Sequence, residues 1–197
     1  MQNPAAQAIV LASSSEYRRT LLDRILTDYE TFSPAIDETV DPSAVPQEFA
    51  ARLARQKAEA GARQHHDALI IGADQVAVLD SQVLGKPGDH HSAVEQLLAA
   101  AGKTVLFFTA VCILDPVSRT RSEYVDKTIV RFRRFDLRLA ESYVRHDEPY
   151  DCAGSFRIEG AGFVLFDSVS TDDPTALVGL PMIWISSRLQ ELGVLLR

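Results

Sequence analysis

Three serines stand between an apolar segment and a helical one near the start of the sequence. Ser13, Ser14 and Ser15 follow the apolar run at residues 9–12, and Arg18 comes three residues after them. A helix that begins here carries about half a positive charge on its unpaired N–H groups and stabilises an oxyanion. The hydroxyls add hydrogen-bond donors, and an arginine binds phosphate in a bidentate manner. The segment therefore predicts a phosphate-binding turn, with a plain serine N-cap beside solvated arginines as the alternative.

Two carboxylate positions predict a cation site. Asp74 follows the buried strand predicted at Leu69–Gly72, inside an otherwise apolar run, where a charge is costly unless it is paired or bound to a metal. Asp37 and Glu38 follow Pro34 in a predicted loop, which is free to approach the cleft where we expect Asp74 to lie. Mg²⁺ is usually held by convergent carboxylates, with phosphate oxygens completing the shell. The alternatives are a hydrogen-bonded structural acid at Asp74 and capping or solvated loop acids at the other two positions.

Two lysines could neutralise phosphate charge in a transition state. Lys86 lies in Gly85–Pro87, where glycine and proline restrict the backbone of a loop. Lys57 shares the apolar face of a predicted helix with Leu53, whereas a solvated lysine would point outward. A solvated role is the alternative for each lysine.

The composition argues against a nucleic-acid polymer or a membrane as the partner of this chain. The chain has 197 residues, 46% of them hydrophobic and 24% charged, and its 20 Lys+Arg against 27 Asp+Glu give a net charge of −7. This charge argues against a nucleic-acid polymer as the main partner. No window approaches the roughly 18–20 apolar residues of a membrane helix. The two cysteines are isolated in the sequence, and neither the P-loop spacing nor a G-x-G-x-x-G motif occurs. We therefore expect a cytoplasmic protein with no membrane partner.

The elements that must position these residues follow from hydrophobic periodicity. Short apolar runs predict strands at residues 9–12, 69–72, 76–79, 105–114, 128–132 and 162–166. Apolar positions three or four apart predict helices through residues 21–26, from 46, through 94–98, at 137–144 and from 181. Pro34, Asp37, Asp41 and Pro42 mark an irregular linker. Because strands and helices alternate without a strict βαβ rhythm, we expect a mixed sheet flanked by helices, in one domain spanning residues 1–197.

Taken in order, these segments resemble the Maf family of nucleotide pyrophosphatases. The resemblance covers the chain from about residue 8 to its end. It rests on six segments, at residues 11–18, 36–38, 52–58, 72–75, 85–87 and 178–181. The resemblance implies an α/β fold of the inosine triphosphatase-like kind, with a long mixed sheet flanked by helices and two lobes around a central cleft. It also implies a homodimer.

The resemblance further implies a divalent metal cation (Mg²⁺, Mn²⁺ or Co²⁺) and a nucleoside triphosphate that is hydrolysed between its α and β phosphates. Asp74 matches the catalytic acid of the family, taken as the proton acceptor, and would share the metal with Glu38. The phosphate- and metal-handling positions of the family match Ser13, Arg18, Glu38, Lys57 and Lys86. Ser14 and Ser15 complete the predicted phosphate-binding turn.

Three positions depart from the thymidine- and uridine-directed pattern of the family: Tyr17, Gln75 and Glu159. This combination, with the segment at residues 152–156, resembles the branch that acts on 7-methyl-GTP. A carboxylate such as Glu159 can accept both N–H groups of a guanine edge, and it attracts a base made cationic by N7 methylation. Tyr17 could stack on that cationic ring, or it could pack against Leu21 instead.

Two other functions remain open on the residues alone. A nucleotide-binding regulator of cell division, without turnover, would keep the serine turn and Arg18 but would not need Asp74. A pyrophosphatase for other non-standard nucleotides, such as deaminated purines, would use the same residues on a different base.

Overall fold

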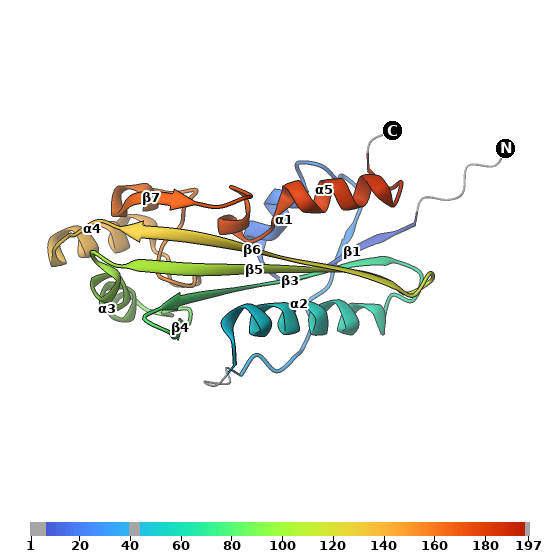
Figure 1. The fold of residues 1–197 in the computed structure, drawn as a ribbon, viewed down its shortest axis with the longest axis horizontal. Coiled ribbons are helices and arrows are strands. Elements are labelled where there is room, and N and C mark those ends of the chain that lie inside the picture. Colours follow the sequence, from blue (N-terminus) through green and yellow to red (C-terminus); the bar gives the residue numbers. More distant parts are fainter. Residues whose placement is uncertain (1–6, 40–43, 196–197) are drawn as a thin grey trace.

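A mixed β-sheet runs through the middle of the molecule (Figure 1). The computed structural model describes residues 7–39 and 44–195, and within these ranges seven strands pair in the order β2-β1-β3-β5-β6-β7, with β4 also on β3. The strands are β1 (Ile9–Ala12), β2 (Glu30–Thr31), β3 (Leu69–Leu79), β4 (Gln82–Leu84), β5 (Thr104–Asp115), β6 (Thr120–Phe132) and β7 (Phe166–Ser170). β1 runs parallel to β2 and β3, and the other pairs are antiparallel. The prediction of a mixed sheet is confirmed.

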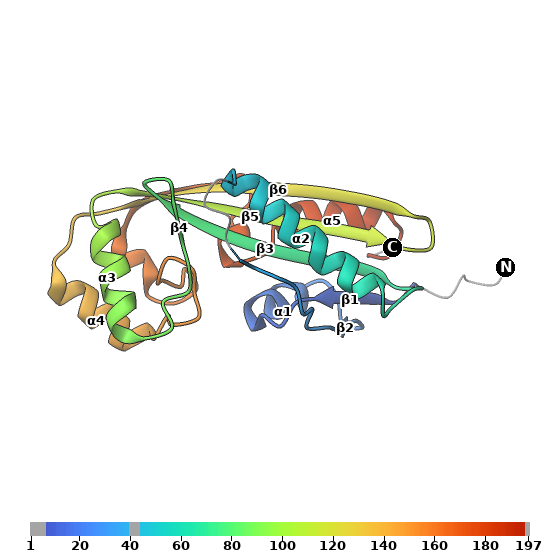
Figure 2. The same ribbon diagram turned by 90° about the horizontal axis from the view of Figure 1, so that it is seen from below.

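Helices cover both faces of this sheet. They are α1 (Glu16–Leu22), α2 (Pro46–Ala62), α3 (His90–Ala100), α4 (Leu137–Asp147) and α5 (Met182–Glu191). α2 lies on one side of the long strands and α5 on the other (Figure 1). Figure 2 shows α3 and α4 gathered at one end of these strands, with α1, β1 and β2 nearer the other end. The molecule therefore has two lobes, as the resemblance implied, and β3, β5 and β6 run through both. No helix in the described ranges is long and apolar enough to cross a membrane.

Three predicted strands are parts of two longer ones. Residues 69–72 and 76–79 belong to the single strand β3, because β5 pairs with it without a break from Ile70 to Leu79 and carries it through Asp74 and Gln75. Asp74 therefore lies in the middle of a strand and not at its end. Residues 128–132 are likewise the last part of β6, whose pairing with β5 begins at Thr120.

Two other predicted elements differ from the structure in their bounds or their type. α1 ends at Leu22, before the predicted boundary, although Leu26 still reaches the core. The strand expected at residues 162–166 is a 3₁₀ helix over Gly162–Leu165, and β7 begins only at Phe166. Its two buried residues, Gly162 and Leu165, are three positions apart, which is the period of a 3₁₀ helix. The part of the predicted linker at residues 41–42 lies outside the described residues.

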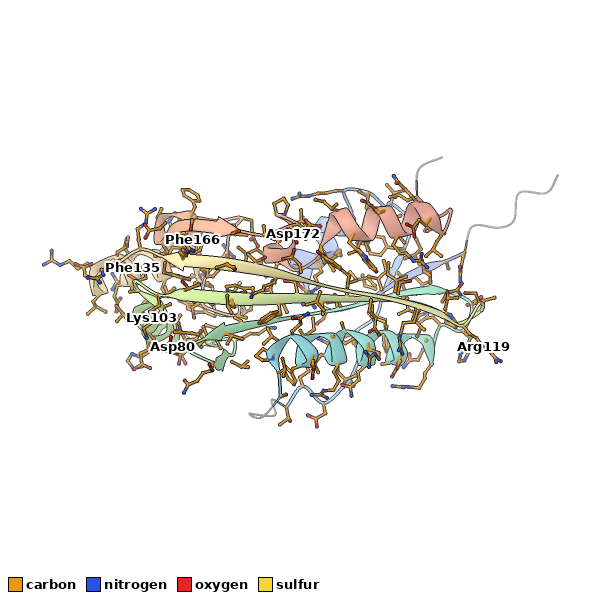
Figure 3. All side chains as sticks on the ribbon, in the orientation of Figure 1. Asp80, Lys103, Arg119, Phe135, Phe166 and Asp172 are labelled. Carbon is orange, nitrogen blue, oxygen red and sulfur yellow. The ribbon has the colours of Figure 1, made fainter. Side chains whose placement is uncertain are left out.

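Tight turns close the hairpins at both ends of the long strands. Asp80 and Ser81 have positive φ angles of 50° and 69°, which is typical of a two-residue hairpin turn, and they join β3 to β4. Lys103 pairs with Asp80 at 2.8 Å beside this turn. Figure 3 shows that pair at one end of the strands and Arg119, in the β5–β6 turn, at the other.

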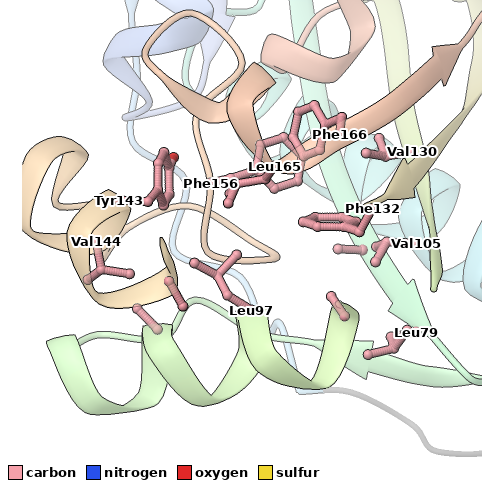
Figure 4. Packing of buried hydrophobic residues seen from close by; sticks show 14 of the residues in the cluster. Leu79, Leu97, Val105, Val130, Phe132, Tyr143, Val144, Phe156, Leu165 and Phe166 are labelled. Carbon is pink, nitrogen blue, oxygen red and sulfur yellow. The ribbon is translucent and has the colours of Figure 1, made fainter. Parts of the chain in front are cut away.

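An aromatic cluster forms the core of the lobe that contains α3 and α4 (Figure 4). Phe132, Phe156 and Phe166 meet edge to face, with ring centroids 4.6–5.7 Å apart. Such contacts add to the free energy of burying the rings. Phe156 thereby anchors the loop at residues 151–159, which has no regular secondary structure of its own.

One edge of β3 is interrupted in its pairing. β1 pairs with this edge as far as Gly72, and β4 pairs with it from Ala77 onward. Between them, residues 73–76 pair only with β5 among the described strands. Because β1 ends beside this gap, the chain that leaves β1 at Ser13 enters it directly. A cleft can form here without breaking the sheet.

We expect Gly72→Ala to lower the free energy of unfolding by about 1–3 kcal/mol, because overpacking a close contact costs this much. A Cβ atom at Gly72 would lie 2.3 Å from the carbonyl oxygen of Ala54 and 2.5 Å from the nitrogen of Ala58, both in the backbone of α2. Urea denaturation measures the loss. Gly85→Ala is the matched control, because a Cβ atom at Gly85 would meet no described atom within 4 Å beyond its chain neighbours. Equal stability of the two variants would contradict this account of the α2–β3 contact.

Candidate active site

A cavity of about 560 Å³ lies at the interrupted edge of β3. Its walls come from both lobes and include the serine turn, the middle of β3, α2 and the loop at residues 151–159. The residues assigned to a site from the sequence line it, with the exception of Asp37: Ser13, Ser14, Ser15, Tyr17, Arg18, Glu38, Lys57, Asp74, Gln75, Lys86 and Glu159. Asp37 does not, because its carboxylate turns back to accept a hydrogen bond from the nitrogen of Thr39 at 2.9 Å.

A buried lysine joins two carboxylates at the centre of this cavity. The Nζ atom of Lys57 lies 2.6 Å from Oδ1 of Asp74 and 2.8 Å from Oε1 of Glu38. Lys57 and Asp74 are only 7% and 8% exposed, whereas Glu38 is exposed. Lys57 reaches this position because it shares the buried face of α2 with Leu53 and Ala58. The alternative of a solvated lysine is therefore wrong for Lys57, and it remains open for the exposed Lys86.

Nearby cations keep Glu38 ionised. Partial burial by itself raises the pKa of Glu38, but the hydrogen bond from Lys57 and the charges of Lys57, Lys86 and Arg18 outweigh it. The pKa of Glu38 therefore lies below its ordinary value. Its carboxylate stays negative at neutral pH and remains available to a cation.

Arg18 fills the gap in the sheet. Its Nη1 atom donates to the carbonyl of Ala73 at 2.9 Å and to Oγ of Ser13 at 3.3 Å, and its Nε atom donates to the carbonyl of Gly179 at 3.1 Å. Burial lowers the pKa of Arg18, and the negative charges of Asp74 and Glu38 oppose that effect. Arg18 thus joins the serine turn, β3 and the segment at residues 176–179, and its charge stays at the cavity wall.

The serine turn is also a helix cap. Oγ of Ser15 accepts a hydrogen bond from the nitrogen of Arg18 at 3.4 Å, as the N-cap interpretation predicts. Ser13, which is buried, accepts one from the nitrogen of Ser15 at 3.2 Å. These contacts position the first turn of α1 at the wall of the cavity. A cap and a phosphate site are compatible, because capping satisfies only part of the N–H groups at a helix start.

Tyr17 meets the opposite lobe across the cavity. Its hydroxyl donates to Oδ1 of Asp151 at 3.2 Å and accepts from the thiol of Cys152 at 3.6 Å. Burial, against the opposing effect of Arg157, raises the pKa of Tyr17 to about 12, so the hydroxyl remains neutral. The contact places the ring of Tyr17 beside the loop that carries Glu159.

Two residues that the sequence analysis missed hold this loop in place. The hydroxyl of Tyr143 accepts a hydrogen bond from the nitrogen of Arg157 at 2.9 Å, and Oδ2 of the buried Asp147 accepts one from the nitrogen of Ala161 at 2.9 Å. Both come from α4. Glu159 lies between these anchors, exposed at the cavity rim. Tyr143 and Asp147 share the buried face of α4 with apolar residues, and a polar side chain in such a position is the sequence signal for an anchoring role.

Gln75 has a structural task in addition to lining the cavity. Its Nε2 atom lies within hydrogen-bond distance of Oγ1 of Thr109 and of the carbonyls of Ala176 and Leu177, at 3.0, 3.0 and 3.2 Å. These bonds tie β3 to the segment at residues 176–179. The amide hydrogens of Gln75 are therefore used within the protein, and only Oε1 is left for any selection of a base.

A second polar network, also missed from the sequence, supports that segment from behind. Asp126 is buried and accepts hydrogen bonds from the hydroxyls of Thr128 and Thr171, at 2.8 and 3.0 Å. Asp173, also buried, accepts from the hydroxyl of Thr175 and from the nitrogen of Ile183 at the start of α5, both at 2.6 Å. Buried carboxylates with several donors fix the path of the backbone.

The donor set at Lys57 fits a divalent cation. Lys57 binds one oxygen of each carboxylate, Oδ1 of Asp74 and Oε1 of Glu38, so a cation would be held by the other two oxygens, Oδ2 of Asp74 and Oε2 of Glu38. Carboxylate oxygens are the ligands that Mg²⁺ prefers, and it commonly takes one or two of them together with phosphate oxygens. The described residues contain no group of three or more His, Cys, Asp or Glu side chains that could hold a metal alone. A cation here would therefore depend on the phosphates of a ligand.

Comparison with known proteins identifies the family of this chain. A family model described as "Maf-like protein" matches residues 8–192. The chain belongs to the Maf family. A 7-methyl-GTP pyrophosphatase of Nitrosococcus oceani is 43% identical to this Maf chain over 193 residues, which are 98% of this chain and 97% of that protein. Proteins with the same name from Alcanivorax borkumensis and Aromatoleum aromaticum are 46% and 47% identical, covering 94% and 95% of this chain and 94% and 97% of their own.

We expect Lys57→Met to lower the free energy of unfolding at pH 7 by about 1–3 kcal/mol, because it leaves the buried Asp74 without its charged partner. The double variant Lys57→Met/Asp74→Asn should lose less than the sum of the two single variants. A double-mutant cycle by urea denaturation measures this coupling.

Lys103→Met is the control for that cycle, because its ion pair with Asp80 is exposed and should contribute less than about 1 kcal/mol. Strictly additive losses at Lys57 and Asp74 would show that the two charges do not stabilise each other.

Proposed function

We propose that this Maf chain is a metal-dependent nucleoside triphosphate pyrophosphatase that converts 7-methyl-GTP to 7-methyl-GMP and pyrophosphate. The observation that carries the proposal is the convergence of Lys57, Asp74 and Glu38 beside the serine turn. The relatives named 7-methyl-GTP pyrophosphatase, which match nearly the whole chain, support this choice of substrate. Removal of a damaged or modified nucleotide is the physiological role that we infer.

Asp74 is the residue that we assign to the chemical step. Its carboxylate accepts the proton of the water that attacks the α phosphorus, and the ammonium group of Lys57, 2.6 Å away, holds it in place. The burial of both groups excludes bulk water, which strengthens their electrostatic interaction with the phosphates. The bond between the α phosphorus and the bridging oxygen breaks, and pyrophosphate leaves.

The phosphates are bound by the cationic side of the cavity. Ser13, Ser14 and Ser15 provide hydroxyls at the start of α1, and Arg18, Lys57 and Lys86 offset the charge of the triphosphate and of the leaving pyrophosphate. Glu38 and Asp74 would hold a divalent cation, which supplies additional charge stabilisation at the phosphate oxygens when it is bound.

The base is assigned to the side of the cavity where Tyr17 meets the loop at residues 151–159. Glu159 accepts the N1–H and N2–H groups of guanine, and the positive charge of a 7-methylated ring adds an electrostatic attraction. Tyr17 stacks on the ring, and Gln75 contributes through Oε1. The homodimer that the resemblance implied and the cytoplasmic location expected from the composition complete the proposal.

We expect the purified protein with Mg²⁺, Mn²⁺ or Co²⁺ to release pyrophosphate and the monophosphate from 7-methyl-GTP, at a higher kcat/KM than from unmodified triphosphates. Asp74→Asn should lower kcat by at least about 10²-fold, the usual contribution of a general base. Product analysis by chromatography measures both.

Asp37→Asn is the control for this assay, because Asp37 lies next to Glu38 in the sequence but faces away from the cavity. The proposal fails if no triphosphate is cleaved. Tight nucleotide binding with no turnover would favour a regulator instead, and a preference for deaminated purines would favour the other non-standard nucleotides.

We expect Glu159→Gln to reduce the preference for 7-methyl-GTP over UTP by about tenfold or more, because hydrogen bonds to a charged group contribute about 1.5–3 kcal/mol. The amide replaces one acceptor by a donor and removes the attraction to the cationic ring. The ratio of the two kcat/KM values measures the effect. An unchanged ratio would refute the assignment of Glu159 to base selection.

A further inference from the structure

Arg157 lines both of two adjoining cavities. The main cavity and a second one of about 370 Å³ share Tyr17, Asp151, Arg157 and Glu159 among their lining residues. Arg157 therefore stands in the same wall as Glu159, two positions away in the sequence. It has no part in the roles assigned above.

The backbone of Arg157 is fixed on both sides. Its nitrogen donates to the hydroxyl of Tyr143 at 2.9 Å, and its carbonyl accepts from the nitrogen of Gly162 at 3.1 Å. A Cβ atom at Gly162 would lie 2.3 Å from that carbonyl oxygen, so the turn closes only with glycine there. The side chain of Arg157 consequently starts from a rigid position.

The guanidinium group of Arg157 has few partners within the protein. It takes part in none of the ion pairs between described residues. Its Nε atom is buried without a hydrogen-bond partner in the described part of the chain. The Tyr17 hydroxyl lies beside it. Because Nε is closed off from solvent, a ligand in the cavity would meet the terminal Nη atoms of this half-buried side chain, which lines the cavity wall.

We propose that Arg157 recognises the 6-oxo group of the guanine base. This inference rests on the proposed function, since it takes a guanine nucleotide as the substrate. A guanidinium group only donates hydrogen bonds, and a carboxylate only accepts them. The guanine edge presents the O6 acceptor next to the N1–H and N2–H donors. Arg157 and Glu159 on one rigid turn match this order of acceptor and donors, whereas adenine has an amino donor in place of O6.

Methylation at N7 changes which atoms of the guanine base Arg157 can bind. An arginine usually binds guanine through O6 and N7 together, but a methyl group removes N7 as an acceptor and leaves O6 alone. The positive charge of the methylated ring is still attracted to this wall, because the carboxylates of Asp151 and Glu159 outnumber the one guanidinium group.

The test compares 7-methyl-GTP with its 6-thio analogue, in which a weakly accepting sulfur replaces O6 while N1–H and N2–H remain. For the wild type, kcat/KM should be about tenfold lower for the thio analogue. Arg157→Met should remove most of this difference by lowering kcat/KM for the oxo substrate selectively, and Arg157→Lys should restore part of it. Arg24→Met is the control, because Arg24 lines only the second cavity. It should keep the wild-type ratio.

Binding of 7-methyl-GMP and its 6-thio analogue, measured by titration calorimetry, repeats the comparison without turnover. The Arg157 inference is overturned if Arg157→Met weakens the oxo and thio ligands equally, as a phosphate-binding or merely structural role would do. It is also overturned if the wild type does not distinguish them. If the wild type shows no turnover, only the proposed function is overturned. The ratio of the two dissociation constants, for 7-methyl-GMP and its 6-thio analogue, still decides the role of Arg157.

Discussion

The interrupted edge of β3 is the constraint on which the rest of the site depends. Backbone groups that lack a strand partner must be satisfied in another way, and the carbonyl of Ala73 is satisfied by Arg18. Because Arg18 also donates to Oγ of Ser13, it holds the serine turn beside the middle of β3. The position follows a general rule for α/β proteins, in which ligands bind beyond the carboxyl end of a strand where the order of its neighbours changes.

The charges around this gap suit a polyanion although the whole chain is negative. Arg18, Lys57 and Lys86 are three cations gathered around the two carboxylates of Asp74 and Glu38, although the whole cavity lining has four cations and five carboxylates and the chain has a net charge of −7. A local excess of positive charge in a partly enclosed space attracts phosphates more strongly than an even distribution would. A divalent cation would increase this excess.

The sequence predicted what is local and missed what depends on distant pairing. The serine turn, the start of α2 at Pro46 and the buried Lys57 each have a signal within a few residues, and the structure places all of them as expected. The length of β3 comes from β5, more than 30 residues away, so Asp74 was assigned to the end of a strand. The buried position of Asp147 on α4 has a signal in the helix pattern, but its partner, the nitrogen of Ala161, could not be predicted, because that contact needs the position of α4 relative to the loop.

The two lobes share β3, β5 and β6, and this continuity limits how they can move. Within the described residues these three strands stay paired without a break across the cleft, so one lobe cannot swing as a rigid body about a few backbone bonds. The available motion is a change of twist along three hydrogen-bonded strands, which is shared by many residues and therefore small at each. Entry and release of a ligand would then depend on the surface loops at the rim of the cleft, while Asp74 on β3 and Lys57 on α2 keep their spacing.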